Sequence, residues 1–204
     1  MPLRPIKVPD SIKQLAYFDG AEELIDSANE AIEAFMLEDE DVIENFVNCD
    51  FHLFDQVLTW ILDEHLLTGN RFLEFGSGFG VGSMLASMRG MESVGIEIEP
   101  RLVEHSTRVI EELGSDAKIY CGSFIPRGIE GLPDLASDVD HVDGEEGDVY
   151  DEIGMEVDDF DLIFAFPWPG EHSFFEAIFE ASAAKGALLL TYRGREGMHL
   201  LRNE

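Results

Sequence analysis

Positive charge is what this sequence has least of. Its 204 residues include 13 Lys and Arg against 43 Asp and Glu, for a formal net charge of -30. A surface with that charge repels phosphate backbones at long range, so nucleic acid is a disfavoured partner. The few cations are unevenly placed, because no Lys or Arg occurs in residues 14–70 or 128–184. The chain therefore has two purely acidic blocks around a mixed one.

Cysteine and long apolar runs are also scarce. The two cysteines, Cys49 and Cys121, are far apart and match no CxxC spacing, which argues against a disulfide framework and against a zinc site. No segment reaches the roughly 18 apolar residues of a membrane span, and residues 1–15 lack the apolar run of a secretory signal. We therefore expect a cytoplasmic protein that holds no metal and does not enter a membrane.

The apolar residues that are present follow two different periods. Up to residue 70 they recur at helical spacing, which predicts amphipathic helices at 21–37 and 51–67 and a helical N-terminal segment over 1–70. From residue 71 onward, short apolar strands alternate with helices. The predicted strands are 71–75, 93–97, 117–121, 160–166 and 186–192, and the predicted helices are 81–89, 100–113 and 171–184.

This alternation indicates an α/β fold with right-handed crossovers. We expect a three-layer, Rossmann-like architecture in which a mainly parallel sheet spans residues 71–204 and the N-terminal helices pack on it. The interval 128–160 is acidic and interrupted by glycines, so we expect a solvated insertion there.

A glycine-rich turn follows the first predicted strand, in the stretch Glu74-Phe-Gly76-Ser-Gly78-Phe-Gly80. In a doubly wound sheet this turn lies at the carboxyl ends of the strands, where ligands bind, and glycines let a ligand approach the backbone amides. Glu97 ends the next strand, where a carboxylate can accept hydrogen bonds from both hydroxyls of a ribose. The pattern indicates a nucleoside cofactor.

Two classes of cofactor contain such a ribose. An NAD-dependent oxidoreductase would use the spacing GxGxxG, but the third position of that pattern is Val81 here. NAD is therefore the less favoured alternative.

The spacing instead resembles the first motif of class I S-adenosylmethionine-dependent methyltransferases, and further motifs follow in order. "SVGIEIEPRLVEHSTRVIEEL" looks like the second strand and helix of that family, "GSF" at 122–124 stands where the family commonly has Gly-Asp-aromatic, and "FDLIFAFPWP" resembles its fourth-strand motif. The resemblance covers roughly residues 50–193. It implies an enzyme that transfers a methyl group from S-adenosylmethionine.

The resemblance also implies roles for individual residues. The glycines would admit the methionine part of the cofactor, Glu74 would order the loop or meet the amino group, and Glu97 would bind the ribose. Ile98 and Phe124 would pack against the adenine, and Ser123 would face its amino group in place of the usual Asp. The full set of expected cofactor residues is Glu74, Gly76, Ser77, Gly78, Phe79, Gly80, Glu97, Ile98, Ser123, Phe124 and Phe166.

The methyl acceptor is less well specified by the sequence. Trp168 and His172 are the expected substrate-side residues, and Glu171, with Asp50 behind it, is the candidate general base. Phe166 replaces the Asn or Asp that aligns an amino nitrogen in exocyclic-amine methylases, which argues against a nucleobase. If the two acidic blocks gather at the pocket mouth, they favour a cationic or neutral acceptor, either a small molecule or a basic protein segment.

A non-catalytic regulatory protein that retains the cofactor pocket is a further alternative, because it would show the same motifs.

The family usually adds two strands after the fifth, but only residues 193–204 remain here, so the C-terminal edge of the sheet would be truncated. We expect either a short strand at 198–202 or a second subunit, in a homodimer, to cover that edge.

Overall fold

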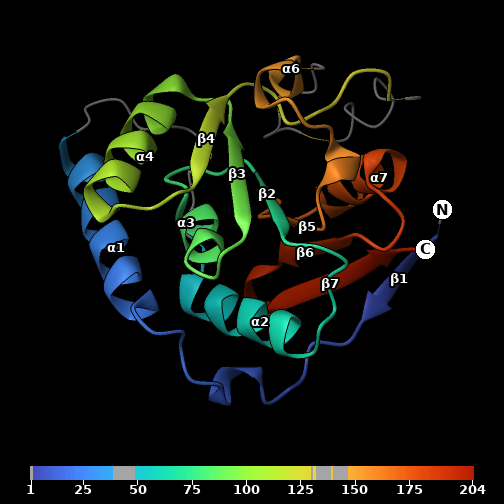
Figure 1. The fold of residues 1–204 in the computed structure, drawn as a ribbon, viewed down its shortest axis with the longest axis horizontal. Coiled ribbons are helices and arrows are strands. Elements are labelled where there is room, and N and C mark those ends of the chain that lie inside the picture. The colour runs from blue at the N-terminus through green and yellow to red at the C-terminus, as the bar shows by residue number, and fades with distance from the viewer. Residues whose placement is uncertain (1, 39–48, 130, 132–138, 140–146) are drawn as a thin grey trace.

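The computed structural model describes residues 2–38, 49–129, 131, 139 and 147–204, and this part of the chain is built around one seven-stranded sheet (Figure 1). Its spatial order is β1-β7-β6-β5-β2-β3-β4. The strands are β1 (Leu3–Ile6), β2 (Arg71–Phe75), β3 (Glu92–Glu97), β4 (Lys118–Cys121), β5 (Leu162–Ala165), β6 (Leu188–Tyr192) and β7 (Met198–Asn203). The five strands from β2 to β6 run parallel, which confirms the predicted α/β fold with a mainly parallel sheet.

The helices begin and end close to the positions that the sequence predicts. They are α1 (Ala21–Glu38), α2 (Phe51–Asp63), α3 (Val81–Ser87), α4 (Pro100–Leu113), α6 (Val149–Ile153) and α7 (His172–Ser182). In α4 the Glu99 side chain accepts a hydrogen bond from Arg101 N at 3.2 Å, Pro100 occupies the first turn, and Gly114 ends the helix in a left-handed conformation.

Among the described residues, no helix combines the length and apolar character that crossing a membrane requires.

Two apolar layers bury the sheet on both faces. Alternate strand residues point to opposite faces. Phe72 and Phe164 therefore pack with α1 to α4, whereas Leu73 and Ile163 pack with α6 and α7. Figure 1 shows the same division, with α1 to α4 on one side of the sheet and α6 and α7 on the other.

The C-terminal edge of the sheet is covered by the chain itself. β7 pairs antiparallel with β6, so the first of the two expected coverings is the one observed, and β6 needs no second subunit. β1 pairs antiparallel with β7, and it therefore runs parallel to β6. The sequence did not predict this strand. It brings the two ends of the chain side by side (Figure 1).

The expectation of a solvated loop is wrong for the last part of the acidic interval. Val149 and Tyr150 of α6 are buried, as is Val157 of η2 (Val157–Asp159). The Tyr150 hydroxyl donates to the Phe124 carbonyl at 2.5 Å. The acidic side chains alternate here with apolar ones that reach the core. The rest of the interval is described only at residues 128, 129, 131, 139, 147 and 148.

A buried ion pair joins the N-terminal helices to the sheet domain. The Arg89 guanidinium, which follows α3, pairs with the Asp55 carboxylate of α2, and the two side chains are 2% and 0% exposed. Asp55 also accepts from Phe18 N at 3.1 Å, and the guanidinium lies 4.4 Å from the centre of the Phe18 ring. Because neither charge reaches water, each requires the other.

Replacing Arg89 tests how strongly the stability of the fold depends on this ion pair. Arg89→Ala leaves the Asp55 carboxylate buried and unpaired, so we expect the free energy of unfolding in urea to fall by about 3–5 kcal/mol. The control is Arg108→Ala, because Arg108 is exposed and lies 3.8 Å from Glu104 on α4, and that variant should lose no more than about 1 kcal/mol. Equal losses from the two variants would contradict the account.

Candidate functional site

A cavity of about 900 Å³ opens at the carboxyl ends of β2, β3, β5 and β6. The strand order reverses between β2 and β5, since β3 and β4 continue on one side and β6 on the other. This is the switch point at which open α/β sheets bind ligands. The volume lies at the upper end of the range of about 300–1,000 Å³ for small-molecule sites, which leaves space for two ligands side by side.

The glycine loop between β2 and α3 forms one wall of the cavity. Ser77 N donates to the Ile96 carbonyl at 3.0 Å, and Gly78 N donates to Glu97 Oε2 at 2.8 Å. Gly80 caps the start of α3 with a φ of +71°, and a Cβ there would lie 2.9 Å from Ile119 Cδ1. Only glycine combines this backbone conformation with this close packing.

Glu74 lies beneath the loop and supports the first turn of α3. Its Oε2 accepts from Ser83 N at 2.8 Å and from Ser83 Oγ at 2.7 Å. A Cβ at Gly82 would lie only 2.5 Å from Glu74 Oε1, so the carboxylate rests directly against the helix backbone. Burial raises the pKa of Glu74 to about 7, although the bonds from Ser83 oppose the shift.

Glu97 ends β3 with its carboxylate in the cavity wall. Oε1 accepts from Glu99 N at 2.9 Å, and Oε2 accepts from Gly78 N. Burial raises the pKa of Glu97, and these backbone bonds act in the opposite direction. A carboxylate has about four acceptor positions, so each oxygen keeps capacity for a hydrogen bond from a ligand.

Aromatic rings line the same end of the cavity. Phe124 stacks between Phe75, with ring centres 4.6 Å apart, and Phe175, at 5.2 Å. Ser123 precedes it, and its Oγ accepts from Ile125 N at 3.2 Å. The Ile98 side chain is apolar but 48% exposed at the cavity edge, which suits a flat ring packed over it.

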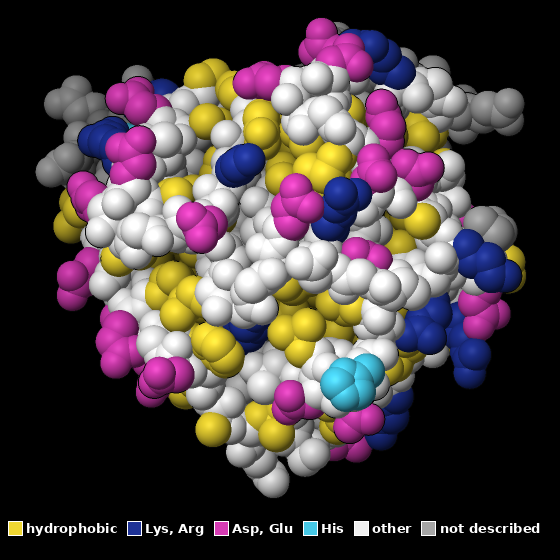
Figure 2. Space-filling model, viewed as in Figure 1, with side chains coloured by type: hydrophobic (Ala, Val, Ile, Leu, Met, Phe, Trp, Pro, Cys, Tyr) yellow, Lys and Arg dark blue, Asp and Glu magenta, His cyan; other side chains and the backbone are white. Residues whose placement is uncertain are grey.

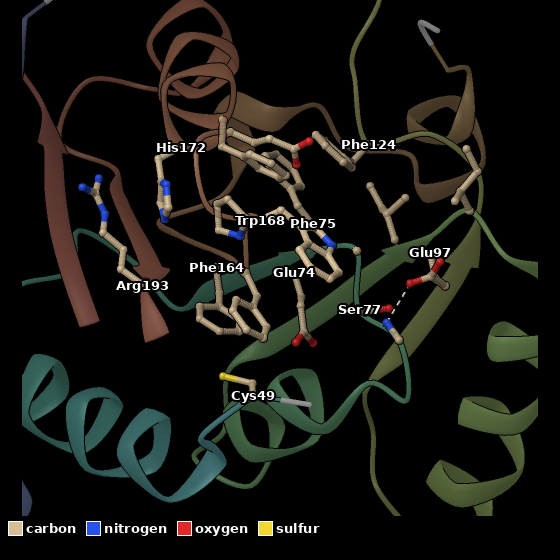
Figure 3. Close-up of a pocket in the computed structure, with 18 of the residues that line it drawn as sticks. Cys49, Glu74, Phe75, Ser77, Glu97, Phe124, Phe164, Trp168, His172 and Arg193 are labelled. Carbon is tan, nitrogen blue, oxygen red and sulfur yellow. Dashed lines mark hydrogen bonds between the residues drawn. The ribbon is translucent and has the colours of Figure 1, made fainter. Parts of the chain in front are cut away.

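The other end of the cavity lies beside α7 and the end of β6. Phe166, Trp168, Glu171, His172 and Arg193 line it. Figure 3 shows His172 and Arg193 at this end and Ser77 and Glu97 at the other, with Phe75, Trp168 and Glu74 between them. The site therefore has a loop-and-carboxylate end and an aromatic-and-basic end.

The cavity brings together all but two of the residues that the sequence predicts for the site. Gly80 is one exception, because it turns the chain into α3 behind the cavity wall. Asp50 is the other. It caps α2, where its Oδ1 accepts from Leu53 N at 3.0 Å. Of the two candidate general bases, only Glu171 lines the cavity.

Several lining residues were not predicted. Arg193 follows the predicted strand 186–192, so its position at a carboxyl end could have indicated it. Cys49 and Phe51 enter the wall from the N-terminal segment, and nothing in their local sequence indicates this. Burial and the charge of Glu74 raise the pKa of the Cys49 thiol, which therefore stays protonated.

The two cation-free blocks do not gather their acidic residues at the cavity among the described parts of the chain, although Glu74, Glu97, Glu99 and Glu196 also line it. Of the two cation-free blocks, only Glu171 contributes a carboxylate to the described lining, while Arg193 and Arg195 contribute cations. Figure 2 shows Asp and Glu spread over the viewed face and interspersed with Lys and Arg. Charge steering of the acceptor stays a prediction.

Comparison with known proteins shows the fold. No family model matches the sequence, and no curated protein does. An RNA methyltransferase of Salinibacter ruber, solved with S-adenosyl-L-homocysteine, is similar in structure, with a TM-score of 0.50, 15% identity, 76% of this chain covered and 92% of that one. A methyltransferase of Geobacter sulfurreducens is similar, with a TM-score of 0.50, 17% identity and coverage of 87% and 90%.

A hypothetical protein of Thermus thermophilus matches to the same degree, with a TM-score of 0.52, 16% identity and coverage of 80% and 92%. At these identities the likeness concerns the fold. The chain has the Rossmann-like fold of class I methyltransferases, as the motifs in its sequence imply.

The raised pKa of Glu74 predicts how stability changes with pH. The folded carboxyl has a pKa of about 7 against 4.5 for the free group, so its protonated form favours folding most fully below pH 4.5, and this contribution is lost as the pH rises through 7. The loss amounts to about 3 kcal/mol. Glu74→Gln should flatten the decline of unfolding free energy between pH 5 and 8, and the exposed control Glu112→Gln should not. Parallel curves for all three proteins would contradict the prediction.

Proposed function

We propose that this protein is an S-adenosylmethionine-dependent methyltransferase. The observation that carries the proposal is the position of Glu97, whose carboxylate is held by Gly78 N across the glycine loop and keeps acceptor capacity toward the cavity. A carboxylate at that place can accept from both ribose hydroxyls of an adenosyl group. The lining of the cavity fits the rest of the group: the exposed Ile98 and the ring of Phe124 suit the adenine, and Ser123 suits its amino group.

The remaining residues of the loop fit the amino-acid part of the cofactor. Gly76 and Gly78 present only backbone to the cavity. Ser77, which lies between these glycines, and Phe79, which follows Gly78, also line it. Glu74 acts by ordering the loop, because its carboxylate is bonded to Ser83 at the start of α3. Bound S-adenosylmethionine supplies an activated methyl group, so the protein's task is to align an acceptor with it and exclude water.

The acceptor half of the cavity is the aromatic-and-basic end. Phe166 and Trp168 form its walls, and Glu171 and His172 provide polar groups. We propose a small molecule or a protein segment as the acceptor, and we disfavour nucleic acid because of the net charge of -30. One structurally similar protein is an RNA methyltransferase, so RNA is the comparison to include in any test.

Binding of S-adenosyl-L-homocysteine tests the cofactor assignment. Glu97→Ala removes one or two charge-assisted hydrogen bonds worth about 1.5–3 kcal/mol each, partly replaced by water, so affinity measured by calorimetry should fall at least about tenfold. The control is Glu104→Ala, which removes an exposed carboxylate of α4 that does not line the cavity and should change affinity far less. NAD binding tighter than S-adenosyl-L-homocysteine would favour an oxidoreductase instead.

A screen with a labelled methyl donor tests the acceptor class. We expect label in small molecules or basic peptides and none in RNA, because the acidic surface repels a phosphate backbone. Transfer to RNA would contradict this part of the proposal. Tight cofactor binding without transfer to any acceptor would favour a regulatory protein.

A further inference from the structure

Five polar side chains gather beneath the first turn of α7, at the acceptor end of the cavity. His172 and Glu176 lie one turn apart on α7, and Arg193 follows β6. His199 stands opposite Thr191 in the antiparallel ladder of β6 and β7, so these two side chains lie on one face of the sheet. We call these five residues the α7 polar cluster.

One strong contact organises the cluster. Arg193 Nη2 donates to Glu176 Oε1 at 2.6 Å, and the two side chains are 22% and 29% exposed. The pair fixes the guanidinium beside α7. Figure 3 shows the ring of His172 between Arg193 and Trp168, and both His172 and Arg193 line the cavity.

Four atoms of the cluster are buried without a hydrogen-bond partner in the described chain. They are His172 Nε2, Thr191 Oγ1, Arg193 Nε and His199 Nδ1. A guanidinium nitrogen only donates, whereas a hydroxyl and the nitrogens of a neutral imidazole can accept or donate. These groups are thus complementary to one another. Since Nε2 of His172 is on the buried side, Nδ1 is the nitrogen left to meet a ligand in the cavity.

Charge and burial keep both histidines neutral. Burial lowers the pKa of His172 and the charge of Arg193 lowers it further, while the charges of Glu176, Glu196 and Glu171 act in the opposite direction with less effect. The pKa of His199 is lowered by the same two causes in the same order. A neutral imidazole keeps a lone pair on one nitrogen, which is what a proton acceptor needs at neutral pH.

The same groups restrict what can bind beside His172. Arg193 is the largest single charge that acts on His172, and Glu176, Glu196 and Glu171 act on it in the opposite direction. Trp168 and Phe166 supply aromatic surface, and Phe166 is itself held against Tyr192 with ring centres 4.9 Å apart. Aromatic walls favour a planar partner.

We propose that His172 accepts the proton of the methyl acceptor, and that this acceptor is a planar molecule carrying a hydroxyl group. The inference rests on the methyltransferase function proposed above. The acceptor oxygen forms a bond to the methyl carbon, the carbon–sulfur bond breaks with its electron pair remaining on sulfur, and the hydroxyl proton passes to Nδ1 of His172. No oxidant or reductant takes part.

Arg193 and Glu176 are positioning residues. Arg193, held by Glu176, opposes protonation of His172 before the acceptor arrives. The proposed tautomer of His172 carries its proton on the buried Nε2, which leaves the lone pair on Nδ1 for the acceptor. Glu171, adjacent in sequence and also in the cavity wall, is the alternative proton acceptor.

Nuclear magnetic resonance of the histidine side chains tests the cluster without any turnover. In the free protein, His172 should titrate below its ordinary value of about 6.5 with its proton on Nε2. Arg193→Gln removes the nearby charge and frees Glu176, so the pKa of His172 should rise. The control is Arg108→Gln, because Arg108 is exposed on α4 and does not line the cavity.

Kinetics test the role in transfer. The probes are phenol and catechol, with labelled methyl donor, and transfer to them should rise with pH through the value that resonance assigns to His172. His172→Gln should lower turnover about 10²–10⁴-fold while the affinity for S-adenosyl-L-homocysteine stays unchanged. His65→Gln is the control, because His65 is exposed on the loop after α2. Arg193→Gln should shift the kinetic midpoint upward by the same amount as the resonance midpoint.

Each outcome distinguishes this inference from the function on which it rests. Failure of the unaltered protein to bind S-adenosyl-L-homocysteine would overturn the methyltransferase proposal itself. With that binding intact, the inference is overturned if His172 titrates at or above about 6.5, or if Arg193→Gln leaves the pKa of His172 unchanged. It is also overturned if Glu171→Gln abolishes transfer while His172→Gln does not, or if neither phenol nor catechol is methylated.

Discussion

The site depends on the hydrogen bond between Gly78 N and Glu97 Oε2, because this bond joins the loop after β2 to the end of β3. Ser77 N adds a second tie, to the Ile96 carbonyl. Together they hold the irregular backbone of the loop against a neighbouring strand, and they do so at the point where the strand order reverses. The Glu97 carboxylate thus both supports the loop and faces the ligand. Few other polar side chains are therefore needed at this end of the cavity.

Burial of charge gives the two ends of the cavity different chemistry. At the loop end, Glu74 and Glu97 are buried carboxylates whose pKa values are raised, and both are stabilised by backbone amides rather than by cations. At the other end, burial and the charge of Arg193, which is paired with Glu176, lower the pKa of His172. A nucleoside with ribose hydroxyls suits the first environment, and an acceptor that releases a proton suits the second.

Local signals predicted the central part of the fold. The strands from β2 to β6 pack against helices, so each appears in the sequence as a short apolar run. The glycines mark the loop between β2 and α3. β1 carried no such signal. Its four residues include Pro5 and are partly exposed, and the strand forms because β7 offers an edge with which it can pair.

Long-range contacts explain the other differences between expectation and structure. In the last part of the acidic interval, Tyr150 and Val157 are buried although acids surround them in sequence, because the core beside Phe124 receives them. The pair of Arg193 and Glu176 spans 17 residues and two elements, so no local pattern indicates it. The N-terminal contribution of Cys49 and Phe51 to the cavity likewise arises from packing of α2 on the sheet.

A crystal structure of the complex with S-adenosyl-L-homocysteine tests the central claim most directly. The account predicts both ribose hydroxyls within hydrogen-bond distance of the Glu97 carboxylate, the amino-acid tail beside Gly76 and Gly78, and the sulfur facing the end of the cavity that holds Trp168 and His172. A ligand bound elsewhere, or one whose ribose makes no contact with Glu97, would contradict it.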